Sequence, residues 1–290
     1  MTNPSRTARR TGLIASFSIV FAACSGAAIP PTAPTAVPAT SAPAAPTAVP
    51  ATSAPAAPSG AAAALAVTVT GVVPGATVKD NSVTISVTAV GYTLSCADAG
   101  KANADGIGHY HVELDHALVN MYCTPSATIS MQNVAPGPHT ITVLPTKNDH
   151  EEVKEGAASI DFTYAPTSPL ATISGASAGT PTIAFVSPAP GSPVSGDFTV
   201  TVKTTGITLS DSLFGKTNVP GYGHWHLNVD STTGPMMGMA TMMGMSGTDT
   251  FQGSTKGIAP GKHTFFAILV DDQHAPLMPE VVAQVDLVVK

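Results

Sequence analysis

The sequence predicts an all-β protein in which two tandem immunoglobulin-like antiparallel β-sandwich domains follow a disordered tether. From Leu65 onward, short runs rich in β-branched residues alternate apolar and polar side chains and are separated by Gly, Pro and Asn. Runs of this kind are typical of strands, and many of them at short spacing favour sandwiches. No stretch shows the apolar repeat of an amphipathic helix, and one pattern of residues occurs twice. The two halves are therefore expected to share one fold.

Residues 1–23 are expected to be a signal peptide of the lipoprotein type. Three arginines and no acidic residue precede an apolar run that ends in Ala22-Ala23-Cys24 and is too short to span a membrane. This ending resembles the lipobox of bacterial lipoproteins, which implies lipidation of Cys24 and a membrane-anchored location in the cell envelope, on its periplasmic or extracellular face. Phe21 stands where such motifs usually have Leu, so simple secretion or an uncleaved anchor is the alternative.

Residues 24–64 consist almost wholly of Ala, Pro, Thr and Ser and are expected to form a disordered, extended tether. The first β-sandwich domain is expected over 65–165, a linker over 166–181 and the second domain over 182–290. Without the signal peptide the chain has nine basic and eighteen acidic residues. This negative balance argues against nucleic acid as a partner.

Each half is expected to contain strands at equivalent places. In the first half these are 67–73, 83–90, 109–115, 127–134, 140–146 and 159–164. In the second half they are 182–186, 198–204, 224–230, 248–251, 264–270 and 281–289. Outside these strands the halves also correspond, since Tyr92-Thr93-Leu94-Ser95 in one matches Ile207-Thr208-Leu209-Ser210 in the other. The correspondence indicates a duplication of the whole domain.

Eight of the nine histidines lie in the repeated pattern. The first copy runs Gly-His109-x-His111, then Pro-Gly-x-His139-Thr, then His150. The second copy runs Gly-His224-x-His226, then Pro-Gly-x-His263-Thr, then His274. The last two histidines are eleven positions apart in both copies, whereas the connection before them differs by nine residues. Because imidazole is the commonest transition-metal ligand among side chains, the pattern predicts a duplicated metal site.

Alternation along the strand at 109–115 places the two histidines of the His-x-His pair on a polar, outward face. Tyr110, Val112 and Leu114 lie on the opposite, apolar face, and the second copy sorts in the same way. Rings at positions i and i+2 of one strand can converge on a single ion. Surface or capping histidines are the alternative, but repetition of the pair with its flanking residues favours ligands.

The other repeated histidines have different surroundings. His150 and His274 lie in polar loops beyond a strand, and they are the better candidates for third ligands. His139 and His263 begin strands after a Pro-Gly turn, and strand parity groups His139 with apolar side chains. These two are therefore either fourth ligands, groups that support the ligands, or structural histidines that bond the turn.

The second half contains an unusual methionine run between its His-x-His pair and His263. Six of the ten methionines lie within ten residues, flanked by Ser, Thr, Gly and Pro. They are Met236, Met237, Met239, Met242, Met243 and Met245. The absence of a helical or strand period predicts a flexible, exposed loop, and thioether sulfur is a soft ligand that selects Cu(I). An adhesive loop or a sink for oxidants is the alternative.

Cys96 and Cys123 are expected to form a disulfide, because two thiols in one small exported domain usually pair. A pair of thiolate metal ligands is the alternative, although their spacing is long and no Cys-x-x-Cys occurs. The second domain contains no cysteine. A site shared by both halves is therefore not expected to use thiolate.

The pattern Gly-His-x-His-(Leu/Val)-x-(Leu/Val)-Asp, followed by Pro-Gly-x-His-Thr and a later histidine, resembles a family of uncharacterised bacterial periplasmic and lipoprotein domains. The resemblance covers about 100 residues in each half, and it implies a sandwich fold and an envelope location but no established activity. His-x-His on a strand also resembles the copper strand of Cu/Zn superoxide dismutases. No bridging histidine or zinc-loop cluster follows at short range, so dismutase activity is not implied.

These patterns together predict an exported, lipid-anchored protein that binds copper for sequestration, delivery or resistance, with zinc as the alternative metal. Histidine suits Cu(II) and methionine suits Cu(I); a copper-handling protein of the envelope is a candidate partner. Two other classes stay open: a dismutase-like copper redox enzyme, and a cell-surface scaffold or adhesion module with structural histidines. No substrate pocket, Ser-His-Asp arrangement or phosphate loop is recognisable, which favours a binding protein over an enzyme.

Overall fold

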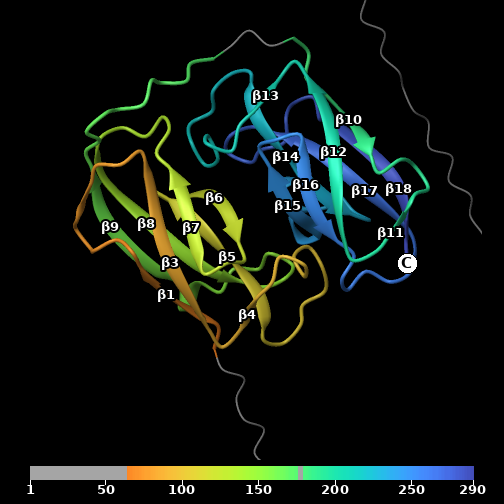
Figure 1. The fold of residues 1–290 in the computed structure, drawn as a ribbon, viewed down its shortest axis with the longest axis horizontal. Helices are drawn as coiled ribbons and strands as arrows, with labels where there is room; N and C mark the ends of the chain where they lie inside the picture. Colours follow the sequence, from red (N-terminus) through yellow and green to blue (C-terminus); the bar gives the residue numbers. More distant parts are fainter. Residues whose placement is uncertain (1–63, 176–178) are drawn as a thin grey trace, which may run out of the picture. The chain divides into compact units, whose positions relative to one another are not determined.

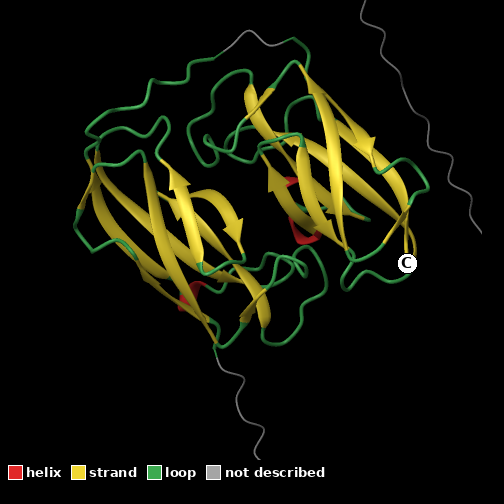
Figure 2. Cartoon of the chain, in the orientation of Figure 1, coloured by secondary structure: helices red, strands yellow, loops and turns green. Residues whose placement is uncertain are grey.

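The computed structural model describes residues 64–175 and 179–290. The expected signal peptide, the lipidation site Cys24 and nearly all of the expected tether lie outside the described residues. Within those ranges the chain forms β-strands joined by turns and three short 3-10 helices (Figure 2). The all-β fold class is therefore confirmed. None of the helices in the described ranges has the length and apolar character needed to cross a membrane.

The first half folds into a sandwich of two sheets (Figure 1). One sheet has the strand order β1-β3-β7, and the other has the order β2-β9-β8-β5-β4, with β6 paired to β5. The elements are β1 (Ala66–Thr70), β2 (Thr77–Val78), β3 (Ser82–Val90), β4 (Thr93–Leu94), β5 (Ile107–Leu114), β6 (Ala117–Tyr122), β7 (Ser126–Ser130), β8 (Gly137–Thr146), η1 (Lys154–Gly156) and β9 (Ala158–Tyr164). Alternate side chains of the facing strands, such as Ile85 and Tyr110, are fully buried between the sheets.

The second half repeats this arrangement. Its sheets have the orders β10-β12-β16 and β11-β18-β17-β14-β13, with β15 paired to β14. The elements are β10 (Thr182–Ser187), β11 (Pro193–Val194), β12 (Asp197–Thr205), β13 (Thr208–Leu209), β14 (Tyr222–Val229), η2 (Pro235–Met237), η3 (Met239–Thr241), β15 (Met242–Ser246), β16 (Thr250–Ser254), β17 (Gly261–Val270) and β18 (Val282–Val289). Trp225 and Phe265 are fully buried in its core. The His-x-His pairs lie on the equivalent strands β5 and β14.

Strands β6 and β15 were not anticipated from the sequence. β6 follows β5 through a two-residue turn, Asp115–His116, in which both residues have positive φ (52° and 70°). Two consecutive positive φ values are typical of the type I′ turns that match the twist of a hairpin. The hairpin places β6 beside the His-x-His strand of the first half, as β15 lies beside that of the second half.

The methionine run is not a flexible, exposed loop, so that expectation is wrong. Met242, Met243 and Met245 lie on β15, which pairs with β14 and is buried along its whole length. Met236, Met237 and Met239 lie in η2 and η3 and are half-buried. The segment is ordered because its backbone bonds to β14 and its side chains fill space between apolar neighbours from both halves.

The two sandwiches belong to one compact unit. Phe214, Met242 and Met245 of the second half are buried in the same apolar cluster as core residues of the first half. Charged side chains also connect the halves, since Lys101 Nζ donates to the Ser254 carbonyl at 2.8 Å and Lys256 Nζ lies 2.7 Å from Asp98 Oδ2. This contact covers the strand faces that carry the histidine pairs.

Candidate metal centres

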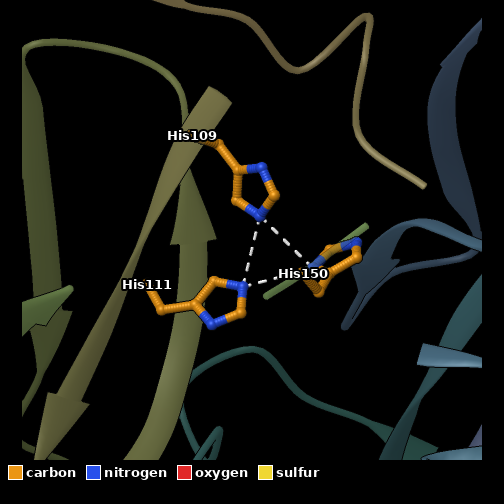
Figure 3. A group of neighbouring side chains, drawn as sticks. All are labelled: His109, His111 and His150. Atoms are coloured by element: carbon orange, nitrogen blue, oxygen red, sulfur yellow. Dashed lines mark hydrogen bonds between the residues drawn. The ribbon is translucent and has the colours of Figure 1, made fainter. Parts of the chain in front are cut away.

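The first centre contains His109 and His111 of β5 and His150 of the turn that follows β8. After β8 the chain turns back, so that Thr146 pairs with Glu152 and the His150 amide donates to the Lys147 carbonyl at 3.0 Å. His150 has a positive φ of 66° at this turn. The turn brings its ring against the face of β5 that carries the other two (Figure 3).

Three ring nitrogens of this first triad face one another (Figure 3). His109 Nε2 lies 3.2 Å from His111 Nε2 and 3.3 Å from His150 Nδ1, and the last two are 3.2 Å apart. A point equidistant from nitrogens at this spacing is about 1.9 Å from each, and an ion slightly outside their plane would make the bonds of about 2.0–2.1 Å typical of imidazole on zinc. The spacing is therefore that of three corners of a tetrahedral site.

The proton positions in the first triad follow from the partners on its outer side. His111 Nδ1–H donates to Glu152 Oε1 at 2.9 Å, and His150 Nε2–H donates to the Met242 carbonyl at 2.6 Å. Both rings then direct a lone pair at the common point. His109 Nδ1 is buried and has no hydrogen-bond partner among the described residues. Without a metal ion, His109 can donate its Nε2–H to one of these lone pairs. When His109 instead carries its proton on Nδ1, all three nitrogens direct a lone pair at the common point, so the donor set fits a metal ion.

The second triad, His224, His226 and His274, has the same construction. His224 Nε2 lies 3.2 Å from His226 Nε2 and 2.8 Å from His274 Nδ1, and His226 Nε2 lies 3.4 Å from that same atom. Within residues 64–175 and 179–290, His224 Nδ1 is buried without a partner, as is the equivalent atom of the first triad. The duplicated pattern in the sequence thus corresponds to duplicated geometry.

Each triad is completed by the other half of the chain. His150 bonds to the carbonyl of Met242 on β15, and His274 Nε2–H donates to the carbonyl of Leu118 on β6 at 2.8 Å. Leu118 and Met242 are equivalent, because they pair with Glu113 and Asn228 at matching positions of β5 and β14. The exchange of carbonyls is therefore reciprocal, and the halves are related by an approximate twofold symmetry.

The halves approach closely where this exchange occurs. Gly100 and Gly215 have positive φ of 72° and 68°, and a side-chain carbon at either would meet the backbone at Met242 or at Leu118. Glycine is required at both positions by the left-handed backbone and by the lack of space. These glycines allow the carbonyls to reach the third histidine of the opposite triad.

The triads are buried, and burial lowers the pKa of five of their histidines. The exposed fraction is 0 % for His109 and His224 and at most 4 % for the other four rings. Burial lowers the pKa of His150 to about 3 and that of His274 to about 4. Burial, followed by the neighbouring imidazoles, holds the pKa of His109, His224 and His226 well below the ordinary range. Neutral imidazole is the form that binds metals.

The surroundings of the triads differ at one position. Glu152 accepts from His111 in the first half, and this hydrogen bond lowers the pKa of its carboxyl group. In the second half Pro276 occupies the equivalent place, since it pairs with Val270 as Glu152 pairs with Thr146. A carboxylate that accepts from a ligand histidine orients the ring and makes it a better donor. The two centres are therefore not chemically identical.

His109 and His111 do not lie on an outward, solvent-facing surface as strand parity suggested. The parity itself is correct, because Tyr110, Val112 and Leu114 are buried in the sandwich core. The opposite face is buried as well, since the second half covers it.

His139 and His263 do not belong to either triad, so of the three alternatives left open by the sequence, a role as fourth ligands is the one the structure does not support. His139 Nδ1–H donates to Asp115 Oδ2 at 2.6 Å, and its Nε2 lies 2.8 Å from the Ala135 carbonyl. His263 makes the same two contacts, with Asp230 and Ala259, at 2.6 and 2.8 Å. Both ring nitrogens are engaged, so these histidines fasten the Pro-Gly turn to the end of the His-x-His strand.

The structure assigns the methionines a different position from the predicted Cu(I)-collecting loop. Met242 contributes its backbone carbonyl to His150, Met245 is buried in the apolar cluster shared with the first half, and Met243 is buried in the core cluster of the second half. Cys96 and Cys123 are joined in a disulfide. Neither cysteine takes part in a histidine triad.

Three contributors to the centres were missed by sequence reasoning. The Glu152 carboxylate was missed although it lies two residues after a candidate ligand. A search near the candidate ligands for carboxylates that could accept a hydrogen bond from a histidine ring could have found it. The carbonyls of Leu118 and Met242 carry no side-chain signal at all. They are visible only once the contact between the two halves is known.

Comparison with known proteins gives only distant similarities. No family model matches the sequence, and no curated protein matches it. Fibronectin(III)-like modules of Clostridium thermocellum CbhA are 14 % identical, cover 77 % of this chain and 94 % of their own, and give a TM-score of 0.25. The endo-beta-1,4-mannanase from Thermotoga petrophila is 13 % identical over 39 % of this chain and 20 % of its own, with a TM-score of 0.23. A Dscam structure is 9 % identical over 79 % of this chain and 46 % of its own, with a TM-score of 0.21.

Fold and site together define a class. This is a tandem β-sandwich protein with two buried groups of three histidines, each of which could hold a metal ion.

Proposed function

We propose that this chain is an exported metal-binding protein that holds copper in its two histidine triads for sequestration, delivery or resistance. One observation carries the proposal: three ring nitrogens converge within 3.2–3.3 Å in the first triad, two of them with their protons bonded away from the common point. All three nitrogens can direct a lone pair at the common point when His109 carries its proton on Nδ1, so the arrangement is suited to a cation. The convergence of three ring nitrogens is repeated in the second half, which argues against coincidence.

The proposal includes a location in the cell envelope, with a lipid anchor at Cys24. The basic start, the short apolar run and the Ala-Ala-Cys ending support it. The Cys96–Cys123 disulfide supports it independently, because disulfides persist in oxidising compartments outside the cytoplasm. A tether rich in Pro and Ala would then separate the folded part from the membrane.

Storage or delivery of the ion agrees better with the geometry than catalysis. Three nitrogens leave one coordination position, but the rings that surround it are almost wholly buried. An enzyme of the dismutase type needs rapid access of its substrate to that position. Copper is preferred to zinc because buried thioethers lie on the neighbouring strands β6 and β15.

The test is metal retention by the full chain. The protein is exposed separately to Cu(I) under anaerobic conditions, Cu(II) and Zn(II), dialysed, and assayed for metal per chain. We expect two tightly held copper ions, one after His109→Asn or His224→Asn, and two after His116→Asn, which alters an exposed histidine. Retention of no metal, or retention that ignores both triad substitutions, would refute the proposal. Superoxide turnover by the loaded protein would replace the carrier with an enzyme.

A further inference from the structure

Met121 and Met245 occupy equivalent positions beside the two triads. Met121 on β6 pairs with His111 on β5, and Met245 on β15 pairs with His226 on β14. Residues directly opposite in an antiparallel pair point to the same face, with Cβ atoms about 4.5–5.5 Å apart. Each methionine therefore lies on the face of its sheet that carries the triad. Met121 lies outside the methionine run and has no signal in the sequence pattern.

The two methionines also share their surroundings at the contact between the halves. Both belong to one buried apolar cluster, and both line one cavity of about 480 Å³. Met243 lines the same cavity, next to the disulfide residue Cys96. Among the described residues that line it, Asp197 is the only charged one. The cavity thus combines three thioethers with a single negative charge.

The two methionine residues are slightly more exposed than the triad histidines, whose exposed fractions are at most 4 %. Met121 and Met245 each have an exposed fraction of 8 %, whereas His109 and His111 have 0 %. Thioether sulfur is a neutral, soft donor that binds Cu(I) and disfavours zinc, calcium and magnesium.

We propose that Met121 and Met245 form a soft-metal site in this cavity, which admits Cu(I) to the interface and supplies each histidine triad with a thioether neighbour. This inference rests on the proposed function, and it names the oxidation state that the centres select. The ion binds as Cu(I), without electron transfer, and Ag(I) is the redox-inactive ion of the same chemical class. The paired arrangement gives one thioether to each triad and makes the selectivity of both depend on one cavity.

The experiment compares the full chain with the Met121→Leu/Met245→Leu double variant. Leucine retains the volume and apolar character, so the fold is expected to persist. Met131→Leu is the matched control, because Met131 is a buried methionine in the core of the first sandwich and does not line this cavity. Affinities for Cu(I) are measured by competition with a chromophoric chelator, and affinities for Zn(II) by a separate competition.

We expect the double variant to lose about tenfold in Cu(I) affinity, equivalent to ~1.4 kcal/mol, with Zn(II) affinity unchanged. The control should match the unsubstituted chain for both ions. A Cu(I) affinity equal to that of the control, or an equal fall for both metals, would overturn the proposal.

A second measurement follows ion binding to the unsubstituted chain. Methionine methyl groups labelled with carbon-13 are followed by NMR while Ag(I) is added to the full chain. The Met121 and Met245 signals should shift first and that of Met131 should stay fixed; the reverse order would contradict the site. If these signals shift but neither triad retains any metal, the proposed function fails while the methionine site stands. If the triads retain metal without such shifts, the methionine site alone fails.

Discussion

The Met242 carbonyl determines which nitrogen of His150 can bind a metal. Because Nε2–H donates to that oxygen, Nδ1 is left to face His109 and His111. In the same way Glu152 fixes the proton of His111 on Nδ1. The choice of nitrogen is thus made by partners outside the triad, and the partners differ between the two halves.

Glu152→Gln tests the effect of the carboxylate on the first centre. The amide oxygen can still accept from His111, but the negative charge that strengthens the ring as a donor is lost. Loss of such an outer partner typically lowers metal affinity about 10- to 100-fold, and we expect a fall in that range at the first centre only. Metal titration should then resolve two unequal sites. Glu151→Gln, at an exposed position, is the control and should leave the titration unchanged.

The buried histidines make the stability of the metal-free chain depend on pH. In the unfolded chain they bind protons near their ordinary pKa of about 6.5, whereas the folded chain keeps the pKa of His150 at about 3 and that of His274 at about 4. Between these values the unfolded state holds more protons, so the free energy of unfolding falls as pH decreases from about 6.5 toward 4.

Above about pH 6.5 the same groups are neutral in both states and should have no effect on stability. The measurement is the urea midpoint at pH 7.5, 6 and 5 for the metal-free full chain. His263 opposes the trend slightly, because its hydrogen bond with Asp230 raises its pKa. A midpoint that stays constant or rises at pH 5 would contradict the burial of the triads.

At the scale of elements, the ends of β5 and β14 are held by one recurring unit. Asp115 accepts from the His139 ring through one oxygen and from the Thr140 amide through the other, at 2.6 and 2.9 Å. Thr140 Oγ1–H in turn donates to Asp161 on β9 at 2.6 Å. The Asp, His and Thr of the sequence pattern therefore connect three neighbouring strands. These three residues thus have a structural role and do not bind the metal.

His139→Ala is expected to destabilise the chain by about 1–3 kcal/mol, since two hydrogen bonds of about 0.5–1.5 kcal/mol each are removed. Metal affinity of both centres should not change. Urea unfolding and metal titration measure the two effects separately, and His116→Asn is the control in the adjoining turn, where asparagine tolerates the positive φ. A loss of metal affinity with normal stability would restore His139 as a ligand.

Much of the element layout could be predicted from the sequence. Alternation identified the longer strands and the two faces of β5, and duplication identified six converging histidines. β15 was missed because its Met-Met-Gly-Met sequence lacks the β-branched residues that favour strands. β15 is ordered because it pairs with β14 and packs against the other half, and both contacts join residues that are distant in the sequence. The burial of the polar face was missed for the same reason.

At the scale of the whole molecule, the contact between the sandwiches is part of each metal centre. The close approach at Gly100 and Gly215 brings the backbones together, and the carbonyls of Met242 and Leu118 then reach the opposite triads. Each centre therefore receives one hydrogen-bond acceptor from the opposite half. Occupation of either centre is therefore expected to depend on an intact interface.

Gly100→Ala tests this dependence. The added carbon would collide with the backbone at Met242 and so displace the carbonyl that bonds His150. Gly106→Ala is a close control, because Gly106 has a similar φ of 67° and nothing near its added carbon, so it reports the backbone cost alone. We expect Gly100→Ala to weaken the first centre about tenfold, ~1.4 kcal/mol, beyond any effect of Gly106→Ala. Equal metal titrations for the two variants would show that the interface does not support the centre.

The reciprocal exchange of carbonyls has a consequence for how such a chain could arise. A protein with a single copy of this domain would lack the oxygen that orients its third histidine. Two separate copies could supply it to each other only as a symmetric homodimer, related by the same twofold axis. Fusion of the genes for two such subunits would preserve both sites and then permit them to diverge, as Glu152 and Pro276 have done.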